Sequence, residues 1–212
     1  MASSAAILDS QPADQSRAIA AANDTPMELW QEVIRDMRAE YLDESHHFPW
    51  ILGFSGGKDS TLVAHAALEM LTALPPSRRN RPVHIVSNDT LVESPVVIAH
   101  LNKVTQAIAG MARNLDLPVT VARTTPELTK SFWVLLIGKG YPSPNQSMRW
   151  CTDRLKIQPT SEYIKQYVSA AGAAIVVLGV RRDESETRQN SINRHKNLRD
   201  TNLSPHSSLP GA

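Results

Sequence analysis

A short run of small, polar and charged residues, Ser55-Gly56-Gly57-Lys58-Asp59-Ser60, has the composition of a phosphate-binding loop. Adjacent glycines let backbone N–H groups converge on one anion, while the serine hydroxyls and Lys58 add further donors. An apolar stretch, residues 50–54, precedes the run, and residues 61–71 follow it with the apolar spacing of a helix. A strand, a glycine turn and a helix N-terminus together favour a phosphate or pyrophosphate ligand.

The run does not match the Walker A loop, in which four residues separate the glycine from Gly-Lys-Ser/Thr. It resembles instead the PP-loop of the ATP pyrophosphatase superfamily, which includes tRNA thiolation enzymes, ammonia-dependent synthetases and phosphoadenylylsulfate reductases. The resemblance implies ATP and Mg²⁺ as cofactors and cleavage of ATP between its α and β phosphates. We expect Lys58 and the loop amides to hold the β and γ phosphates. The predicted nucleotide-binding residues of the loop are Ser55, Gly56, Gly57, Lys58, Asp59 and Ser60.

Strand and helix patterns alternate along the chain. Apolar runs predict strands at residues 50–54, 82–87, 118–122 and 174–180, the last one apolar throughout like a buried parallel strand. Helical spacing, with an N-cap at Thr25 for the first helix, predicts helices at residues 26–41, 61–71, 96–115, 127–137 and 160–171. The alternation predicts an α/β fold, a doubly wound and mostly parallel sheet with helices on both faces, whose ligands lie at the carboxyl ends of the strands. The PP-loop resemblance implies the adenine nucleotide alpha hydrolase-like version of this fold.

Composition limits the class of protein. The chain has 212 residues, 42% of them hydrophobic, and a net charge of +1, which suits one soluble domain whose nucleic-acid-binding surface, if it has one, is local. We expect residues 1–24 to form a mobile tail and residues 25–212 one PP-loop domain. One cysteine excludes an internal disulfide, and no apolar stretch could span a membrane. The N-terminus lacks a secretory signal, so we expect a cytoplasmic protein.

Carboxylates are the candidate metal ligands. Asp59 could hold Mg²⁺ or cap the following helix, and the sequence leaves both roles open. Asp89 follows the second predicted strand, where it could meet Mg²⁺ or the nucleotide ribose, or could simply belong to a turn. His46 and His47 are interpreted as surface residues, because no partner with metal-ligand spacing is visible.

The single cysteine, Cys151, lies in the segment Arg149-Trp150-Cys151-Thr152-Asp153-Arg154-Leu155-Lys156. Nearby cations lower the pKa of a thiol, and the thiolate can carry a persulfide, attack an electrophile or bind iron. Cys151 is therefore a predicted catalytic residue and a candidate iron–sulfur ligand. The alternative is an inert buried cysteine. One thiol cannot hold an iron–sulfur cluster, which normally needs four ligands.

Arginines follow the last predicted strand. Arg181, Arg182 and Arg188 could neutralise charge as pyrophosphate departs, and we predict them to be catalytic. Acidic residues alternate with them, so a solvated, salt-bridged helix start is the alternative. The basic segment 194–199 could follow a nucleic-acid backbone or could form a solvated charged surface.

Three segments, residues 55–60, 149–156 and 178–185, together resemble the phosphoadenylylsulfate reductase-like branch of the PP-loop enzymes. Residues 150–156 and 202–210 further resemble the DndC family, the sulfurtransferase components of bacterial DNA phosphorothioation. This resemblance implies replacement of a non-bridging oxygen of the DNA backbone by sulfur. It also implies a 4Fe–4S cluster, with DNA, a cysteine desulfurase and other Dnd components as partners.

The chain departs from that family in two respects. DndC-type proteins are longer, which implies a C-terminal truncation or a short variant, and a 4Fe–4S cluster would need cysteines from outside this chain. The leading hypothesis is an ATP-pyrophosphatase-type sulfurtransferase that adenylates a DNA backbone phosphate for sulfur insertion. The alternatives are a reductase of phosphoadenylylsulfate or adenylylsulfate, which would need a reactive C-terminal cysteine, and an ATP-binding scaffold without turnover.

Overall fold

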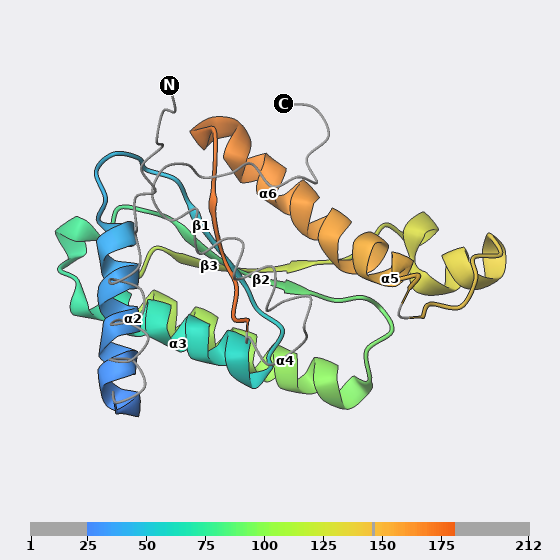
Figure 1. Cartoon of the computed structure of the whole chain (residues 1–212), viewed down its shortest axis with the longest axis horizontal. Helices are drawn as coiled ribbons and strands as arrows, with labels where there is room; N and C mark the ends of the chain where they lie inside the picture. The colour runs from blue at the N-terminus through green and yellow to red at the C-terminus, as the bar shows by residue number, and fades with distance from the viewer. Residues whose placement is uncertain (1–24, 146, 181–212) are drawn as a thin grey trace, which may run out of the picture.

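The computed structural model describes residues 25–145 and 147–180. Its centre is one sheet of four parallel strands in the order β3-β2-β1-β4 (Figure 1). The chain moves outward from β1 to β3 and then returns to the other side of β1 as β4, so the order reverses beside β1. Ligands of open α/β sheets bind at such a reversal, beyond the carboxyl ends of the strands. The strands are β1 (Trp50–Gly53), β2 (Val83–Asn88), β3 (Val119–Thr124) and β4 (Ile175–Val177).

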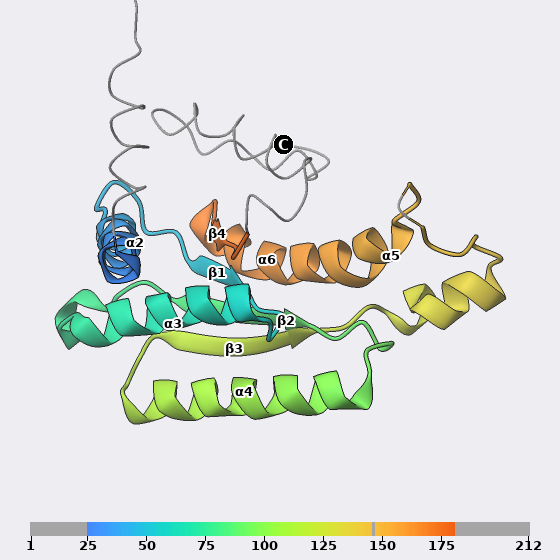
Figure 2. The ribbon, with the colours of Figure 1, turned by 60° about the horizontal axis from the view of Figure 1, so that its bottom comes forward.

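Helices cover both faces of this sheet (Figure 2). One face carries α3 and α4, with α2 packed against α3, and the other face carries α6. The predicted α/β fold, with a mostly parallel sheet between helices, is therefore confirmed. No helix within the described ranges is long and apolar enough to cross a membrane. The long helices are α2 (Pro26–Tyr41), α3 (Lys58–Ala73), α4 (Pro95–Asn114) and α6 (Gln158–Ala171).

The main core lies between the sheet and helices α2, α3 and α4. Trp50 and Leu52 of β1 and Val83 and Ile85 of β2 point to this side and are fully buried. Successive strand residues point to opposite faces, so His84, between the two β2 residues, faces α6. Its ring lies 4.3 Å from that of Tyr167 on α6, measured between centroids.

Shorter helical turns also occur, and all of them except η1, which precedes β2, lie between β3 and α6. The single helix expected at residues 127–137 is divided in two, because Ser131 is extended (φ −67°, ψ 158°) and separates a 3₁₀ turn from a helical segment at residues 132–138. An extended residue cannot continue a helix, so a new helical turn begins after Ser131, and the ring of Phe132 in that turn stacks on Trp150. The short elements are the 3₁₀ turns η1 (Pro76–Arg78) and η2 (Leu128–Lys130), the π-helical turns η3 (Val134–Gly138) and η4 (Asp153–Ile157), and α5 (Trp150–Thr152).

The last strand also differs from its prediction. Residues 174–180 were expected to form a fully buried strand, but β4 has three residues and Val176 is 52% exposed. In the described part of the chain β4 pairs with β1 alone, so it lies at an edge of the sheet. The apolar run correctly predicts a strand here, but apolar composition alone does not show whether a strand lies at the centre or at the edge of a sheet. The expected tail, residues 1–24, lies outside the described residues.

Candidate functional site

The glycine run forms the loop between β1 and α3. Gly56 has a φ of +74°, a left-handed conformation that favours glycine. The Ser60 hydroxyl accepts the Ser55 N–H at 3.2 Å and donates to the Gly57 carbonyl at 3.0 Å. The hydroxyl oxygens of Ser55 and Ser60 are 3.1 Å apart. The two serines therefore fix the shape of the loop from inside.

The first turn of α3 has no side-chain cap. Its N-cap residue is Gly57, and no side-chain hydrogen bond closes the helix start. The first N–H groups of a helix have no intrahelical acceptor, so this end attracts anions. Lys58 is exposed and, within residues 25–145 and 147–180, makes no hydrogen bond or ion pair. Asp59 is half-buried in the same turn.

Two neighbouring segments press against this loop. A Cβ atom at position 179 would lie 2.7 Å from the carbonyl oxygen of Asp59, so glycine is needed where the chain leaves β4. On the other side, His100 of α4 places its Nε2 3.3 Å from the carbonyl oxygen of Gly56. The structure thus packs the end of β4, the glycine loop and α4 together at the point where the strand order reverses.

Asp89 lies just beyond β2 in a turn. Its carboxylate accepts the Leu91 N–H at 3.0 Å and lies 3.8 Å from the Arg123 guanidinium, measured from Oδ2 to Nη1. Its own N–H donates to the carbonyl of Thr124 at 2.8 Å. This is the arrangement of the turn aspartate that the sequence left open. The predicted role of Asp89 at Mg²⁺ or the ribose remains a prediction.

Asn88 ties the cysteine-containing segment to the sheet. Its side-chain NH₂ donates to Thr124 Oγ1 at 2.7 Å, to Thr160 Oγ1 at 2.6 Å and to the Lys156 carbonyl at 3.3 Å. Lys156 Nζ in turn lies 3.8 Å from Glu93, in the loop before α4. The segment 149–156 is therefore anchored at the same edge of the sheet as the glycine loop.

Cys151 itself is half-buried and reduced in α5. No hydrogen bond or ion pair within the described part of the chain joins it to the glycine loop, and α5 lies apart from the start of α3 in both views (Figures 1 and 2). Its sulfur chemistry remains a prediction. Arg181, Arg182 and Arg188, and the basic segment 194–199, lie outside the described residues.

Residues 49–201, which include β1, the glycine loop and the cysteine segment, match the phosphoadenosine phosphosulfate reductase domain. The chain belongs to this family. An uncharacterized protein of Methanocaldococcus jannaschii, MJ0973, is 29% identical over 136 residues, which are 64% of this chain and 26% of that protein. This chain thus spans about a quarter of the length of that curated relative. The solved U34-tRNA thiolase NcsA from Methanococcus maripaludis, with its 4Fe–4S cluster, aligns with a TM-score of 0.43 and 12% identity, over 82% of this chain and 52% of that chain.

For a phosphoadenosine phosphosulfate reductase domain, three groups can be tested against the residues present. Nucleotide phosphates fit the glycine loop, because Gly57 has no side chain over the uncapped start of α3. Asp59 fits a Mg²⁺ ion bound jointly with phosphates, since such ions use one or two carboxylates. A 4Fe–4S cluster does not fit, because Cys151 is the single cysteine of this sequence.

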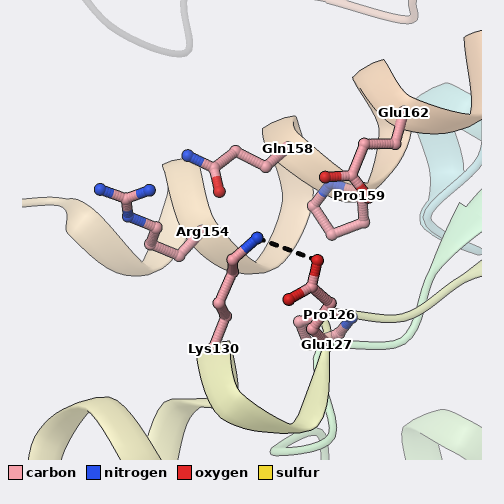
Figure 3. Close-up of a pocket in the computed structure, with 7 residues that line it drawn as sticks. All are labelled: Pro126, Glu127, Lys130, Arg154, Gln158, Pro159 and Glu162. Atoms are coloured by element: carbon pink, nitrogen blue, oxygen red, sulfur yellow. Dashed lines mark hydrogen bonds and ion pairs between the residues drawn. The ribbon is translucent and has the colours of Figure 1, made fainter. Parts of the chain in front are cut away.

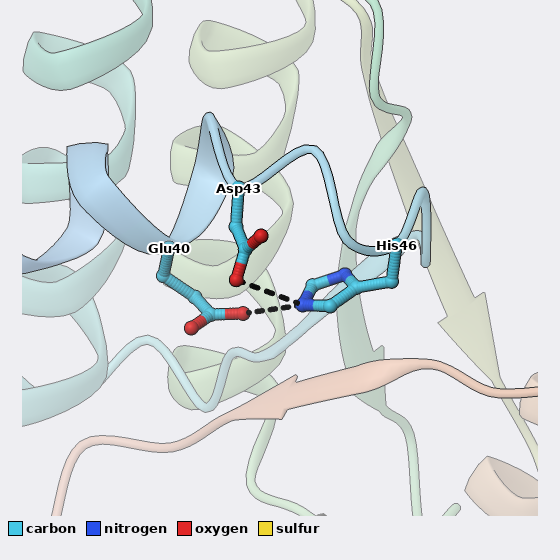
Figure 4. A group of neighbouring side chains, drawn as sticks. All are labelled: Glu40, Asp43 and His46. Carbon is cyan, nitrogen blue, oxygen red and sulfur yellow. Dashed lines mark ion pairs between the residues drawn. The ribbon is translucent and has the colours of Figure 1, made fainter.

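His47 is exposed, as predicted, whereas His46 is largely covered, with 14% of its side chain exposed. Its Nε2 lies 3.2 Å from Glu40 Oε1 and 3.8 Å from Asp43 Oδ2 (Figure 4). Arg81 lies 3.3 Å from the other ring nitrogen, and guanidinium can only donate. A metal-bound histidine normally donates from that nitrogen to an acceptor. These side chains therefore form hydrogen bonds and ion pairs that join the segment after α2 to Arg81, two residues before β2, rather than a metal centre.

A small hollow lies between the β3–η2 loop and the start of α6 (Figure 3). Its volume is about 10 Å³, room for about one water molecule. Lys130 and Glu127 on its rim pair with each other at 3.0 Å. The hollow is too small to hold a nucleotide, and its lysine is already paired with a carboxylate. It is lined by Pro126, Glu127, Lys130, Arg154, Gln158, Pro159 and Glu162.

A cluster of aromatic and polar side chains around the buried His84 holds α6 against the sheet. His84 Nδ1 lies 3.0 Å from the hydroxyl of Tyr163, whose ring packs on that of Tyr167. Burial lowers the pKa of His84, and burial together with a hydrogen bond to Tyr167 raises the pKa of Tyr163. Both groups are therefore neutral near pH 7, as a cluster inside a protein requires.

Sequence reasoning missed three residues of this site. Gly179 lay within the strand predicted at residues 174–180, but its contact with Asp59 depends on the strand order. Asn88 stood at a predicted strand end, which is a usable signal, although nothing local indicated its three acceptors. His100 lies in the middle of a helix, and no pattern in the sequence pointed to it.

Proposed function

We propose that this domain binds ATP at the glycine loop, cleaves it between the α and β phosphates, and adenylates a backbone phosphate of DNA for sulfur insertion. A non-bridging phosphate oxygen of DNA attacks the α phosphorus, and pyrophosphate leaves. A sulfur nucleophile then attacks the activated DNA phosphorus, and AMP leaves. Adenylation is the useful first step because an unmodified phosphate oxygen is a poor leaving group.

One observation carries the proposal: the glycine loop precedes a helix whose start has no side-chain cap, at the point where the strand order reverses. The left-handed Gly56 and the two bridging serines hold this loop in shape without occupying its outer side. Lys58 is exposed next to the helix start, where it can follow a phosphate. These features suit a polyphosphate better than a neutral ligand.

Other residues take roles that follow from their chemistry. Lys58 and the loop amides bind the β and γ phosphates, and Asp59 helps to hold Mg²⁺, with Asp89 as a second carboxylate. Arg181, Arg182 and Arg188 stabilise the departing pyrophosphate. These assignments extend the sequence predictions to the proposed reaction.

Cys151 is the residue that we propose for the sulfur step. A persulfide on Cys151 would attack the adenylated phosphorus with its outer sulfur and leave a sulfur–sulfur bond between the cysteine and the DNA. A thiol reductant from a partner protein must then reduce this bond, which releases the phosphorothioate and restores the cysteine. A cysteine desulfurase and other Dnd-type components are the partners that such chemistry needs, in a cytoplasmic setting.

A reductase of phosphoadenylylsulfate or adenylylsulfate is the second candidate, because the family takes its name from that reaction. Such an enzyme uses a sulfonucleotide and releases no pyrophosphate from ATP. A nucleotide-binding scaffold would bind ATP without turnover. Pyrophosphate release therefore separates the three functions.

The test measures pyrophosphate release from ATP and Mg²⁺, with and without DNA. We compare the wild type with Lys58→Ala, Cys151→Ser and Lys165→Ala, the last being an exposed lysine of α6 as a matched control. The proposal expects DNA-dependent release that Lys58→Ala abolishes and that Cys151→Ser and Lys165→Ala retain. Sulfite release from a sulfonucleotide, without pyrophosphate release from ATP, would instead identify the reductase.

A further inference from the structure

Four aromatic residues gather at the carboxyl edge of the sheet, beside the cysteine segment. We call Phe132, Trp133, Tyr141 and Trp150 the aromatic ledge. Phe132 stacks on Trp150 with 5.4 Å between ring centroids and 22° between ring planes, and Tyr141 meets Trp150 edge-on at 5.3 Å. The Trp150 indole N–H donates to the Pro142 carbonyl at 2.8 Å. The inner rings of the ledge are therefore held firmly in place.

Trp133 is the outer member of the ledge. Its ring stands nearly perpendicular to Phe132, at 87° with a centroid distance of 5.0 Å, and the residue is 57% exposed. Large aromatic side chains are normally buried, and an exposed one on a rigid support is a typical binding feature. A planar ring of this kind can stack against a planar ligand.

The surroundings of the ledge are basic. Residues 130–156 contain five lysines or arginines and one acidic residue, although the whole chain has a net charge of only +1. Three of these cations pair with carboxylates: Lys130 with Glu127, Arg154 with Asp153 and Lys156 with Glu93. Lys139 and Arg149 make no ion pair within the described residues. Lys139 and Arg149 of this segment are exposed on either side of the ledge residue Tyr141 along the chain. Aromatic rings among cations are the features with which proteins bind single-stranded nucleic acids.

We propose that the aromatic ledge binds an unpaired base of single-stranded DNA by stacking on Trp133, while Lys139 and Arg149 contact the flanking phosphates. This inference rests on the proposed function for its choice of DNA. Trp150 and Arg149 directly precede Cys151, so the ledge and the residue proposed to carry sulfur belong to the same segment of the chain. Bases inside a duplex are already stacked on each other, so the site selects unpaired or extruded nucleotides.

The ledge differs from a protein-docking patch in its charge. When two copies of a chain associate, positive charges on one surface must face negative charges on the other. Two copies of this basic segment would instead repel each other. The negatively charged backbone of DNA is complementary to this basic segment whatever the base sequence. Charge complementarity therefore favours nucleic acid over self-association.

The experiment measures binding of a short fluorescein-labelled single-stranded oligodeoxythymidine to the full chain by fluorescence anisotropy, without ATP. We expect Trp133→Ala to weaken binding by roughly tenfold, the effect typical of one stacked base. Trp133→Phe, which keeps a ring, retains most of the affinity. Ile137→Ala is the matched control, because Ile137 is 76% exposed in the same segment and has no ring. A DNA duplex of the same length binds more weakly and without dependence on Trp133.

Three results would overturn the inference. One is an equal loss in Ile137→Ala and Trp133→Ala, accompanied by a dimer in sedimentation velocity, because an apolar interface between copies would explain both. Another is binding that does not change in Trp133→Ala. The third is tighter binding of single-stranded RNA than of DNA, which would overturn the choice of DNA.

The two proposals fail separately. Trp133-dependent DNA binding without pyrophosphate release from ATP would overturn the proposed function and leave the ledge as a DNA site. Lys58-dependent pyrophosphate release without oligonucleotide binding would overturn the ledge as a DNA site and leave ATP cleavage at the glycine loop in place.

Discussion

Helices α2 and α3 have 16 residues each, and they begin in opposite ways. At the start of α2, the Thr25 hydroxyl accepts the Glu28 N–H at 3.3 Å, and the Glu28 carboxylate accepts the Thr25 N–H at 2.7 Å. At the start of α3, Gly57 offers no side chain at all. Side chains of α2 therefore accept hydrogen bonds at its own start, whereas the first backbone N–H groups of α3 are left for a ligand.

Helix α4 follows the pattern of α2, because the Ser94 hydroxyl accepts the Val97 N–H at 3.3 Å. Capping of this kind contributes about 1 kcal/mol to stability. Omitting the cap at α3 therefore has a cost in stability, and a ligand-binding role explains why a glycine stands there. The comparison of the two helix starts can be tested by changing each of them.

The largest effect is expected from Gly57→Asp, which gives α3 the cap that it lacks. An aspartate at the N-cap raises stability by a few tenths of a kcal/mol. Its negative charge faces the proposed phosphate site, so ATP affinity should fall by more than about tenfold. Isothermal titration with ATP and Mg²⁺ measures the loss. Gly57→Asn is the matched control, since it caps the helix without a charge and should lose much less; equal affinities in wild type and Gly57→Asp would contradict our interpretation of the loop.

Gly179→Ala should affect both stability and binding. The new methyl group would meet the Asp59 carbonyl oxygen at 2.7 Å and push the first turn of α3 away from β4. Such overpacking costs about 1–3 kcal/mol, and ATP affinity should fall with it. The control is Gly110→Ala, because a Cβ there meets nothing within 4 Å and alanine in a helix gains up to about 1 kcal/mol. Chemical denaturation and ATP titration measure the stability and the ATP affinity of both variants. If Gly179→Ala changes neither quantity more than Gly110→Ala does, the contact between Gly179 and Asp59 does not shape the loop.

Local patterns account for the features that sequence reasoning predicted correctly. The start of α2 at Pro26 follows from a capping box within four residues, and the glycine loop follows from a contiguous motif. Both signals lie within one stretch of chain. The loop could therefore be found, and its chemistry proposed, before any tertiary contact was known.

Features that depend on distant segments could not be predicted. His46 meets Arg81 only because the end of α2 returns to β2, and Gly179 meets Asp59 only because β4 adds beside β1. The expected helix at residues 127–137 is interrupted at the extended Ser131, although no glycine or proline in that stretch signals a break. Propensity gives way to tertiary packing where the two disagree.

Thr25→Ala should have a smaller effect, confined to stability. Loss of the hydroxyl leaves the Glu28 N–H without its partner and should reduce the free energy of unfolding by about 1 kcal/mol. ATP affinity should stay at the wild-type value, because α2 packs against α3 beyond its first turn, where Trp30 contacts His65 and Glu69. Thr25→Ser, which keeps the hydroxyl, should recover most of the stability in urea denaturation. A drop in ATP affinity in Thr25→Ala would show that the two helix starts are coupled.

The smallest expected effect is the pH dependence of the α2 cap. Hydrogen bonds from the Thr25 backbone N–H and hydroxyl lower the pKa of Glu28 below its ordinary value of 4.5. A lowered carboxyl pKa means that the ionised form stabilises the fold above pH 4.5, and that this contribution disappears as the pH falls through the pKa of the folded state. Glu28→Gln keeps the hydrogen-bonding shape without the charge. The thermal midpoints of wild type and Glu28→Gln should therefore differ slightly near pH 7 and converge in acid, whereas a constant difference would mean that the charge of Glu28 does not act through the cap.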